Sequence, residues 1–234
     1  MLELVGVSIS GVTHERLNRV TLTVRPGEVL GLVGPSGAGK STVLALMAGA
    51  LTCERGRLTL DGREVSKQPG RLRACAGHAG EAPLGPVDVS VQDWLRLWGR
   101  LDGLSSAGLA ERVAQAMTRF ALAPISAVPV SHLARVERNR VRCARLWVRQ
   151  PRLYLIDAAD DALDPASERA LVGAVRAATG AGASVVLELT REALATTVCD
   201  RVVALDAGAV AFEASRADGD FVARVATGCR GAQA

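Results

Sequence analysis

The sequence predicts an α/β fold with a mainly helical insert, and three features of this 234-residue chain lead to that prediction. Short apolar runs at 28–34, 151–157 and 184–189 have the length and composition of strands that are buried on both faces. The first run is followed directly by a segment of helix composition, 39–51. Between about 90 and 149, apolar side chains recur three and four residues apart, which indicates amphipathic helices.

The N-terminal region is predicted to be rich in β-strands. The segments "LELVGVSI" (2–9) and "VTLTV" (20–24) are short strand candidates, and "RPGE" (25–28) has the composition of a turn. The stretch "RGRLTLDGREV" (55–65) predicts a hairpin around Asp61-Gly62, because this dipeptide favours a tight two-residue turn.

The second half returns to alternating helices and strands. A helix is predicted over "ASERALVGAVRAA" (166–178), and a final strand over "RVVALDAG" (201–208). We expect one domain with three parts, whose boundaries are approximate: a core of 1–85 and 150–215, a helical subdomain of 86–149 and a short C-terminal tail of 216–234.

Composition excludes several classes of protein. Apolar residues make up 49% and charged residues 22%, which is typical of a globular chain. No apolar run approaches the roughly 18–20 residues that span a bilayer, and we see no signal peptide. The five cysteines form no C-x-x-C pair, so we expect reduced thiols in a cytosolic compartment and neither a zinc site nor a disulfide framework.

The basic residues are strongly biased toward arginine. Of 28 Lys and Arg residues, only Lys40 and Lys67 are lysine, and the formal net charge is a mild +4. Because lysine is so rare in this chain, its presence at position 40 indicates that this position needs a compact ammonium group. The planar guanidinium of arginine does not provide one.

Lys40 lies in a motif that predicts phosphate binding. The segment "GPSGAGKS", Gly34 to Ser41, matches G-x-x-x-x-G-K-[ST] between an apolar strand and a helix. Glycines let the backbone approach phosphates, backbone N–H groups and the helix N-terminus supply positive potential, and Lys40 reaches the β- and γ-phosphates. The alternative is an ordinary glycine-rich turn before a helix. The predicted nucleotide-binding residues are Gly34, Pro35, Ser36, Gly37, Ala38, Gly39, Lys40, Ser41, Thr42 and Asp157.

Asp157 is the predicted partner of this loop at a Mg²⁺ site. It follows the apolar run "LYLI" in the stretch "LIDAADDALD", where a carboxylate would hold Mg²⁺ together with the Ser41 hydroxyl. On its own, Asp157 would be read as a strand-end aspartate that caps a turn. The phosphate loop favours the metal role.

These motifs, in this order, resemble the ATP-binding subunits of ABC transporters over nearly the whole chain. The segments "RLTLDGREV", "RVRCAR", "LDPASERAL" and "DRVVALDAG" are similar to family segments. The resemblance implies a P-loop, RecA-like core with an N-terminal antiparallel β region and a helical subdomain. It also implies ATP sandwiched between two subunits that drive a transmembrane partner. The stretches "VPV", "ARLW" and "WGRLDGLSSAGLAERV" lean toward the haem-exporter branch of cytochrome c maturation, or toward drug and lipid exporters.

The chain departs from the family pattern at its own nucleotide site. The position of the water-activating glutamate holds Ala158, and the position of the switch histidine holds Arg191, which cannot accept a proton. The glutamine that touches Mg²⁺ aligns best with Glu81, a further Mg²⁺ candidate. The aromatic ring that stacks on adenine is expected near Gly11, where His14 is a weak substitute.

The signature segment that would face a partner subunit's ATP also departs from the family pattern. It aligns with Leu133, Ala134, Arg135, Val136 and Glu137, so its serine and both of its glycines are replaced. Arg135 acting as an arginine finger on the partner's ATP is one interpretation, and a tolerated substitution is the simpler one.

We therefore expect an ATP-binding subunit that binds Mg-ATP with weak or no hydrolysis at the cytoplasmic face of a membrane. Its partners would be a transmembrane subunit and a second, more active ATP-binding subunit, with no nucleic acid. The alternatives are an ABC-fold pseudo-ATPase that serves as a scaffold or regulator, and an active ATPase with a displaced carboxylate at Glu81, Asp160 or Asp161.

Overall fold

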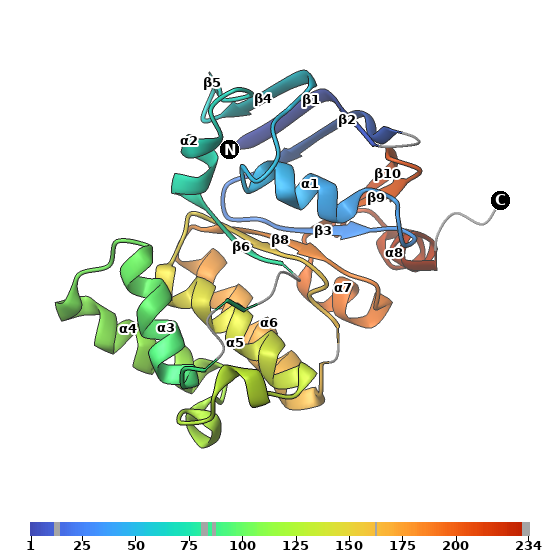
Figure 1. Ribbon diagram of the computed structural model, residues 1–234. Coiled ribbons are helices and arrows are strands. Elements are labelled where there is room, and N and C mark those ends of the chain that lie inside the picture. The colour runs from blue at the N-terminus through green and yellow to red at the C-terminus, as the bar shows by residue number, and fades with distance from the viewer. Residues whose placement is uncertain (12–14, 81–83, 86–87, 162, 231–234) are drawn as a thin grey trace. The chain divides into compact units, whose positions relative to one another are not determined.

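The computed structural model describes residues 1–11, 15–80, 84–85, 88–161 and 163–230. The chain divides into two compact units, which are described separately (Figure 1). The first unit comprises 1–78, 152–160 and 178–234, and the second comprises 79–151 and 161–177. Among the described residues, no helix is long and apolar enough to cross a bilayer.

An antiparallel sheet of four strands forms one layer of the first unit. Its order is β2 (Glu15–Val24), β1 (Leu2–Ser10), β4 (Arg55–Leu60) and β5 (Arg63–Glu64). The predicted hairpin at Asp61-Gly62 is confirmed: it joins β4 to β5, and both residues have positive φ, 51° and 76°. Both central residues of a type I′ turn need positive φ, which Asp and Gly tolerate.

A six-stranded sheet forms the second layer. Its order is β10 (Ala209–Ser215), β9 (Arg201–Asp206), β3 (Val29–Val33), β8 (Ser184–Glu188), β7 (Leu153–Ile156) and β6 (Ala76–Ala79). Strand β3 pairs in parallel with β8 and β9, and β7 pairs in parallel with β8. All residues of β3 and β7 are buried, as the continuous apolar runs predicted. The carboxyl ends of β3, β7 and β8 therefore lie at one edge of this sheet.

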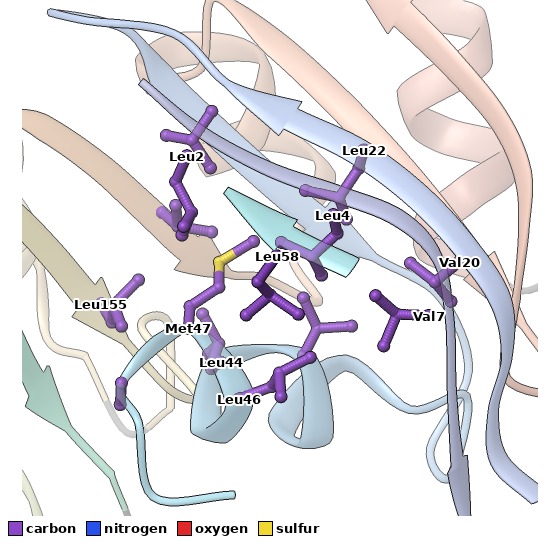
Figure 2. Packing of buried hydrophobic residues seen from close by; sticks show 14 of the residues in the cluster. Leu2, Leu4, Val7, Val20, Leu22, Leu44, Leu46, Met47, Leu58 and Leu155 are labelled. Atoms are coloured by element: carbon purple, nitrogen blue, oxygen red, sulfur yellow. The ribbon is translucent and has the colours of Figure 1, made fainter. Parts of the chain in front are cut away.

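The main core lies where helix α1 (Lys40–Met47) meets both sheets. Figure 2 shows Leu44 and Met47 of α1 together with Leu4 and Leu58 of the antiparallel sheet and Leu155 of β7. All five side chains are almost fully buried. Burying one such side chain contributes about 1.5–3 kcal/mol. This packing holds the N-terminus of α1 at the edge where β3, β7 and β8 end.

A buried ion pair links several strand ends of the first unit. Arg201, at the start of β9, contacts Glu28 at 2.9 Å, and both side chains are more than 90% buried. The same guanidinium contacts Glu213 of β10 at 2.8 Å and donates to the backbone carbonyl of Thr23 in β2. A buried arginine needs partners for its donors, and here two strands, β10 and β2, and the residue preceding β3 supply them.

The second unit is helical. Its helices are α3 (Val91–Leu101), α4 (Ser106–Arg119) and α5 (Arg135–Arg149), with 3₁₀ turns at Ala123–Ile125 and Val130–His132, and with most of α6 (Pro165–Gly180). Trp94 is 1% exposed and its indole N–H donates to the carbonyl of Leu84 at 2.6 Å. Phe120 and Trp147 pack edge to face at 5.1 Å. The unit contains the predicted insert of 86–149 and also residues 161–177.

The segment predicted as a C-terminal tail contains a packed helix, α8 (Phe221–Arg230). Its buried residues include Phe221, Val225 and Ala226. At Gly228, a Cβ atom would lie 2.6 Å from Val33 of β3, so glycine allows close contact with the sheet. With ten residues, α8 offers fewer than three turns of periodicity, too few for a strong sequence signal. The short connector α2 (Pro69–Cys75) and helix α7 (Glu192–Val198) complete the first unit.

His78 of β6 makes folding stability sensitive to pH. Burial lowers the pKa of His78 below 6.5, and its Nε2 has no hydrogen-bond partner among the described residues. The unfolded chain therefore binds a proton more readily, and stability falls as pH drops through about 6.5. We expect His78→Gln to flatten the dependence of the unfolding free energy on pH between 7.5 and 5 in urea titrations.

The matched control is His132→Gln, because this histidine is exposed. Equal slopes in wild type and in His78→Gln would contradict the prediction.

Candidate functional site

The predicted phosphate loop lies between β3 and α1 and has an open, cradle-shaped backbone. Gly34, Gly37 and Gly39 have φ values of 142°, 81° and 98°. At Gly39 a Cβ atom would also lie 2.8 Å from the carbonyl oxygen of Arg16. Helix α1 begins at Lys40, directly after the loop, so the loop and the free N–H groups of the first turn adjoin one another. Positive φ and close packing therefore both require glycine here.

Lys40 is buried within this loop. Its ammonium donates to the carbonyl oxygens of Gly34 and Pro35, both at 2.9 Å, and lies 3.4 Å from a carboxylate oxygen of Glu188. Only 5% of the side chain is exposed. A compact ammonium with three donors satisfies all these partners, which agrees with the expectation that position 40 needs lysine.

The loop borders a cavity of about 230 Å³. It is lined by Arg16, Ser36, Gly37, Gly39, Lys40, Ser41, Thr42 and Glu188. Six of the ten predicted nucleotide-binding residues thus share one cavity. Of the other four, Ala38 is buried and Gly34 and Pro35 bind the ammonium of Lys40 through their carbonyls. Asp157 is hydrogen-bonded to the cavity residue Glu188.

Two lining residues were not predicted from the sequence. Arg16, an exposed residue of β2, contributes a cation to the cavity wall. Glu188 contributes a carboxylate at the end of β8. The one sequence signal for Glu188 was a single acidic residue in the apolar run "SVVLEL". An ionisable residue in a buried strand needs a partner, and is therefore a candidate site residue.

Asp157 and Glu188 form a carboxyl pair. Residues Ile156 and Leu187 are paired in β7 and β8, so the next residue of each strand reaches the same edge. Burial, then the hydrogen bond and charge of Asp157, raise the pKa of Glu188 to about 7, while Lys40 and Ser41 act in the opposite direction. The Ser41 hydroxyl also donates to Glu188 at 2.9 Å. Two carboxyl groups and a hydroxyl are the hard oxygen donors that Mg²⁺ prefers, so the residues present fit a Mg-nucleotide.

Ala158, where the family has its water-activating glutamate, lies in a left-handed backbone conformation with φ of 46°. The next residue, Ala159, donates its N–H to the carbonyl oxygen of Glu188 at 2.9 Å. The methyl group of Ala158 offers neither charge nor lone pair. The chain therefore turns sharply just after Asp157 and presents no carboxylate at this position.

Asp160 organises the turn that carries Arg191. Its carboxylate accepts N–H bonds from Thr190, at 2.7 Å, and from Arg191, and it lies 3.2 Å from the Thr190 hydroxyl. Asp160 is only 6% exposed. Its oxygens are thus engaged in holding the segment between β8 and α7, a structural role.

The signature-like segment lies in the second unit at the start of α5. Ala134 precedes the helix and donates its N–H to the carboxylate of Glu137 at 2.8 Å. Arg135 pairs with Asp161 at 2.8 Å, and Asn139 donates to the backbone carbonyl of Asp161 at 2.7 Å. The segment is therefore held by contacts within its own unit. Glu81 and His14 lie outside the described residues, and Gly11 follows β1.

Comparisons with known proteins identify the family. A family model described as ABC transporter matches residues 17–160, more than half of the chain. The chain belongs to the ABC transporter family. A solved ABC-family structure, described as the ATP binding subunit of an ABC transporter, superposes with a TM-score of 0.87 at 25% identity, covering 98% of this chain and 99% of that one. The expected ABC-type α/β fold is thereby confirmed.

Two curated ABC relatives illustrate the range of the family. Nod factor export ATP-binding protein I of Cupriavidus metallidurans is 31% identical over 195 residues, which cover 83% of this chain and 64% of that protein. Hemin import ATP-binding protein HmuV of Pseudomonas entomophila is 32% identical over 223 residues, covering 89% and 84%. The chain thus spans slightly less than two thirds of the first relative. What the chain shares with both is sequence similarity over most of its own length.

The left-handed conformation of Ala158 generates a stability prediction. Glycine adopts positive φ without steric cost, so we expect Ala158→Gly to raise the free energy of unfolding by about 0.5–1 kcal/mol. Ala159→Gly is the matched control. It removes a buried methyl group and adds backbone freedom, and should lower stability by about 1 kcal/mol. Urea denaturation measures both. A loss of stability in Ala158→Gly would refute the prediction.

Proposed function

We propose that this chain is an ABC transporter subunit that binds Mg-ATP and hydrolyses it weakly or not at all. The observation that carries the proposal is the contrast within one site. The loop, Lys40, Ser41 and Asp157 supply the groups that hold phosphates and Mg²⁺, whereas Ala158 replaces the group that would activate water. Magnesium, when bound, would screen the phosphate charge.

Nucleotide binding is supported by the donors that face the cavity. The ammonium of Lys40, backbone N–H groups at the start of α1 and the hydroxyl groups of Ser41 and Thr42 border the same space. They match the negative charge and the acceptor oxygens of a triphosphate. Arg16 adds a cation that can stack on a purine or pair with a phosphate, in a site where no aromatic residue was identified from the sequence.

Weak turnover is supported by what replaces the water-activating groups. Attack on a γ-phosphate needs a positioned water and a group that orients it or takes its proton. Ala158 does neither, and Arg191 carries a permanent positive charge. Two of the displaced carboxylates considered from the sequence are engaged elsewhere: Asp160 holds the turn at Thr190 and Arg191, and Asp161 pairs with Arg135.

The start of α5 supports weak interaction with a partner subunit's nucleotide. In the family this helix N-terminus faces the other subunit's ATP. Here the Glu137 carboxylate takes the N–H of Ala134 and places a negative charge in the first turn of the helix. A carboxylate at this position competes with phosphate for the same positive end of the helix.

Defects at both surfaces of one chain favour assembly with a different ATP-binding subunit. A homodimer would have two sites defective on both sides, whereas with an intact second subunit each of the two impaired sites keeps one complete half. We therefore propose a more active paralogue as the second subunit, and a transmembrane partner at the cytoplasmic face. Co-purification with a transmembrane protein separates this proposal from a non-transport scaffold. The names of the two curated relatives, one for export and one for import, support transport without favouring a direction.

Lys40→Ala tests nucleotide binding. We expect the affinity for a fluorescent ATP analogue to fall about 10- to 100-fold, because a charge-assisted contact contributes roughly 1.5–3 kcal/mol. Fluorescence titration in Mg²⁺ measures it. Lys67→Ala is the matched control, since the other lysine is exposed and bonds the carbonyl of Cys53. Brisk, Lys40-dependent release of phosphate by the wild-type chain would overturn the claim of weak hydrolysis.

Arg16→Ala tests the contribution of Arg16 to the cavity wall. Loss of a guanidinium that stacks on the base or meets a phosphate should weaken binding of the analogue two- to fivefold, corresponding to about 0.5–1 kcal/mol. Arg19→Ala, an exposed arginine on the same strand that does not line the cavity, should leave affinity unchanged. Equal losses in the two variants would indicate a general charge effect and contradict a specific role for Arg16.

A further inference from the structure

We propose that Glu188 is a cation-binding residue of this site, and that it binds the nucleotide's Mg²⁺ together with Ser41 and Asp157. The inference rests on the proposed function, because it names an additional residue at the same site. It adds a second protein carboxylate to the pair of side chains, Ser41 and Asp157, that the motifs predicted.

The position of Glu188 follows from the sheet. Strand β8 lies between β3, which leads into the phosphate loop, and β7, which leads into Asp157. Leu32 of β3 pairs with Glu188, and Ile156 of β7 pairs with Leu187. The carboxyl end of β8 therefore delivers its last side chain between the two motifs, which are more than 100 residues apart in the chain.

The contacts of Glu188 are with the groups that hold Mg²⁺ and phosphate. One carboxylate oxygen accepts the Ser41 hydroxyl at 2.9 Å, and the other lies 3.4 Å from the ammonium of Lys40. Asp157 is hydrogen-bonded to the same carboxyl group. Glu188 also lines the nucleotide cavity, with 13% of its side chain exposed. Its carboxylate is therefore accessible from the cavity.

The charge balance favours a cation ligand over a purely structural residue. Lys40 supplies one positive charge for two carboxyl groups, and it also serves two backbone carbonyls. Two like charges that are close together and mostly buried repel each other, so the nucleotide-free arrangement is unfavourable with both ionised. A glutamine could bond Ser41 without this cost. A divalent cation held by both carboxylates would remove the repulsion that Lys40 offsets only in part.

Glu188→Gln tests the inference through the Mg²⁺ dependence of nucleotide binding. A fixed concentration of a fluorescent, non-hydrolysable ATP analogue is titrated with MgCl₂. We expect the Mg²⁺ concentration at half-maximal binding to rise about tenfold, because one ligand loses its charge. In EDTA the variant should bind the analogue at least as tightly as wild type, since a negative charge near the phosphates is gone.

The control and a second variant keep the outcomes distinct. Glu192→Gln, an exposed carboxylate at the start of α7, should keep the wild-type Mg²⁺ midpoint, and Glu188→Ala should shift it as Glu188→Gln does. If wild type binds the analogue but both Glu188 variants keep its Mg²⁺ midpoint, the inference fails while the proposed function stands. If wild type does not bind the analogue even at saturating Mg²⁺, both fail.

Discussion

The site depends on the contacts that the ammonium group of Lys40 makes. This ammonium donates to the carbonyl oxygens of Gly34 and Pro35 in the loop. It also lies next to Glu188, which forms a carboxyl pair with Asp157. Without this charge, the carboxyl pair would lose the cation that contacts Glu188. The packing of α1 on both sheets sets the position of Lys40, because the helix begins at that residue.

In the proposed function, different segments of the first unit are responsible for phosphate binding and for acting on water. The groups proposed to hold phosphate belong to the loop and to α1, whose apolar residues pack in the main core. Groups that would act on water belong to the turn after β7 and to the segment after β8, and there Ala158 and Arg191 replace the expected side chains. Asp160 links those two segments to each other. The turn that carries Ala158 thus has a structural role, since the carboxylate of Asp160 organises both segments.

Much of the fold could be predicted because its signals are local. Buried strands such as β3 and β7 are continuous apolar runs, and the phosphate loop is one contiguous motif. The position of Glu188 in the site could not be predicted from the sequence. Its partner Asp157 is 31 residues earlier and becomes its neighbour only through parallel pairing of β7 and β8. The role of Asp160 depends on a similar long-range contact with Thr190. Helix α8 was missed because its pattern is too short.

The left-handed backbone at Ala158 bears on how such a chain can evolve. Alanine already bears the roughly 1–2 kcal/mol that this conformation costs a side chain with a Cβ atom, so a glutamate introduced there would add little backbone strain. Such a change would leave Arg191 in place, and Asp160 fastens the turn to the segment that carries Arg191. Under the proposed function, the backbone at Ala158 is therefore no barrier to regaining a carboxylate, and the second substituted position, Arg191, is what a single reversion would leave unrepaired.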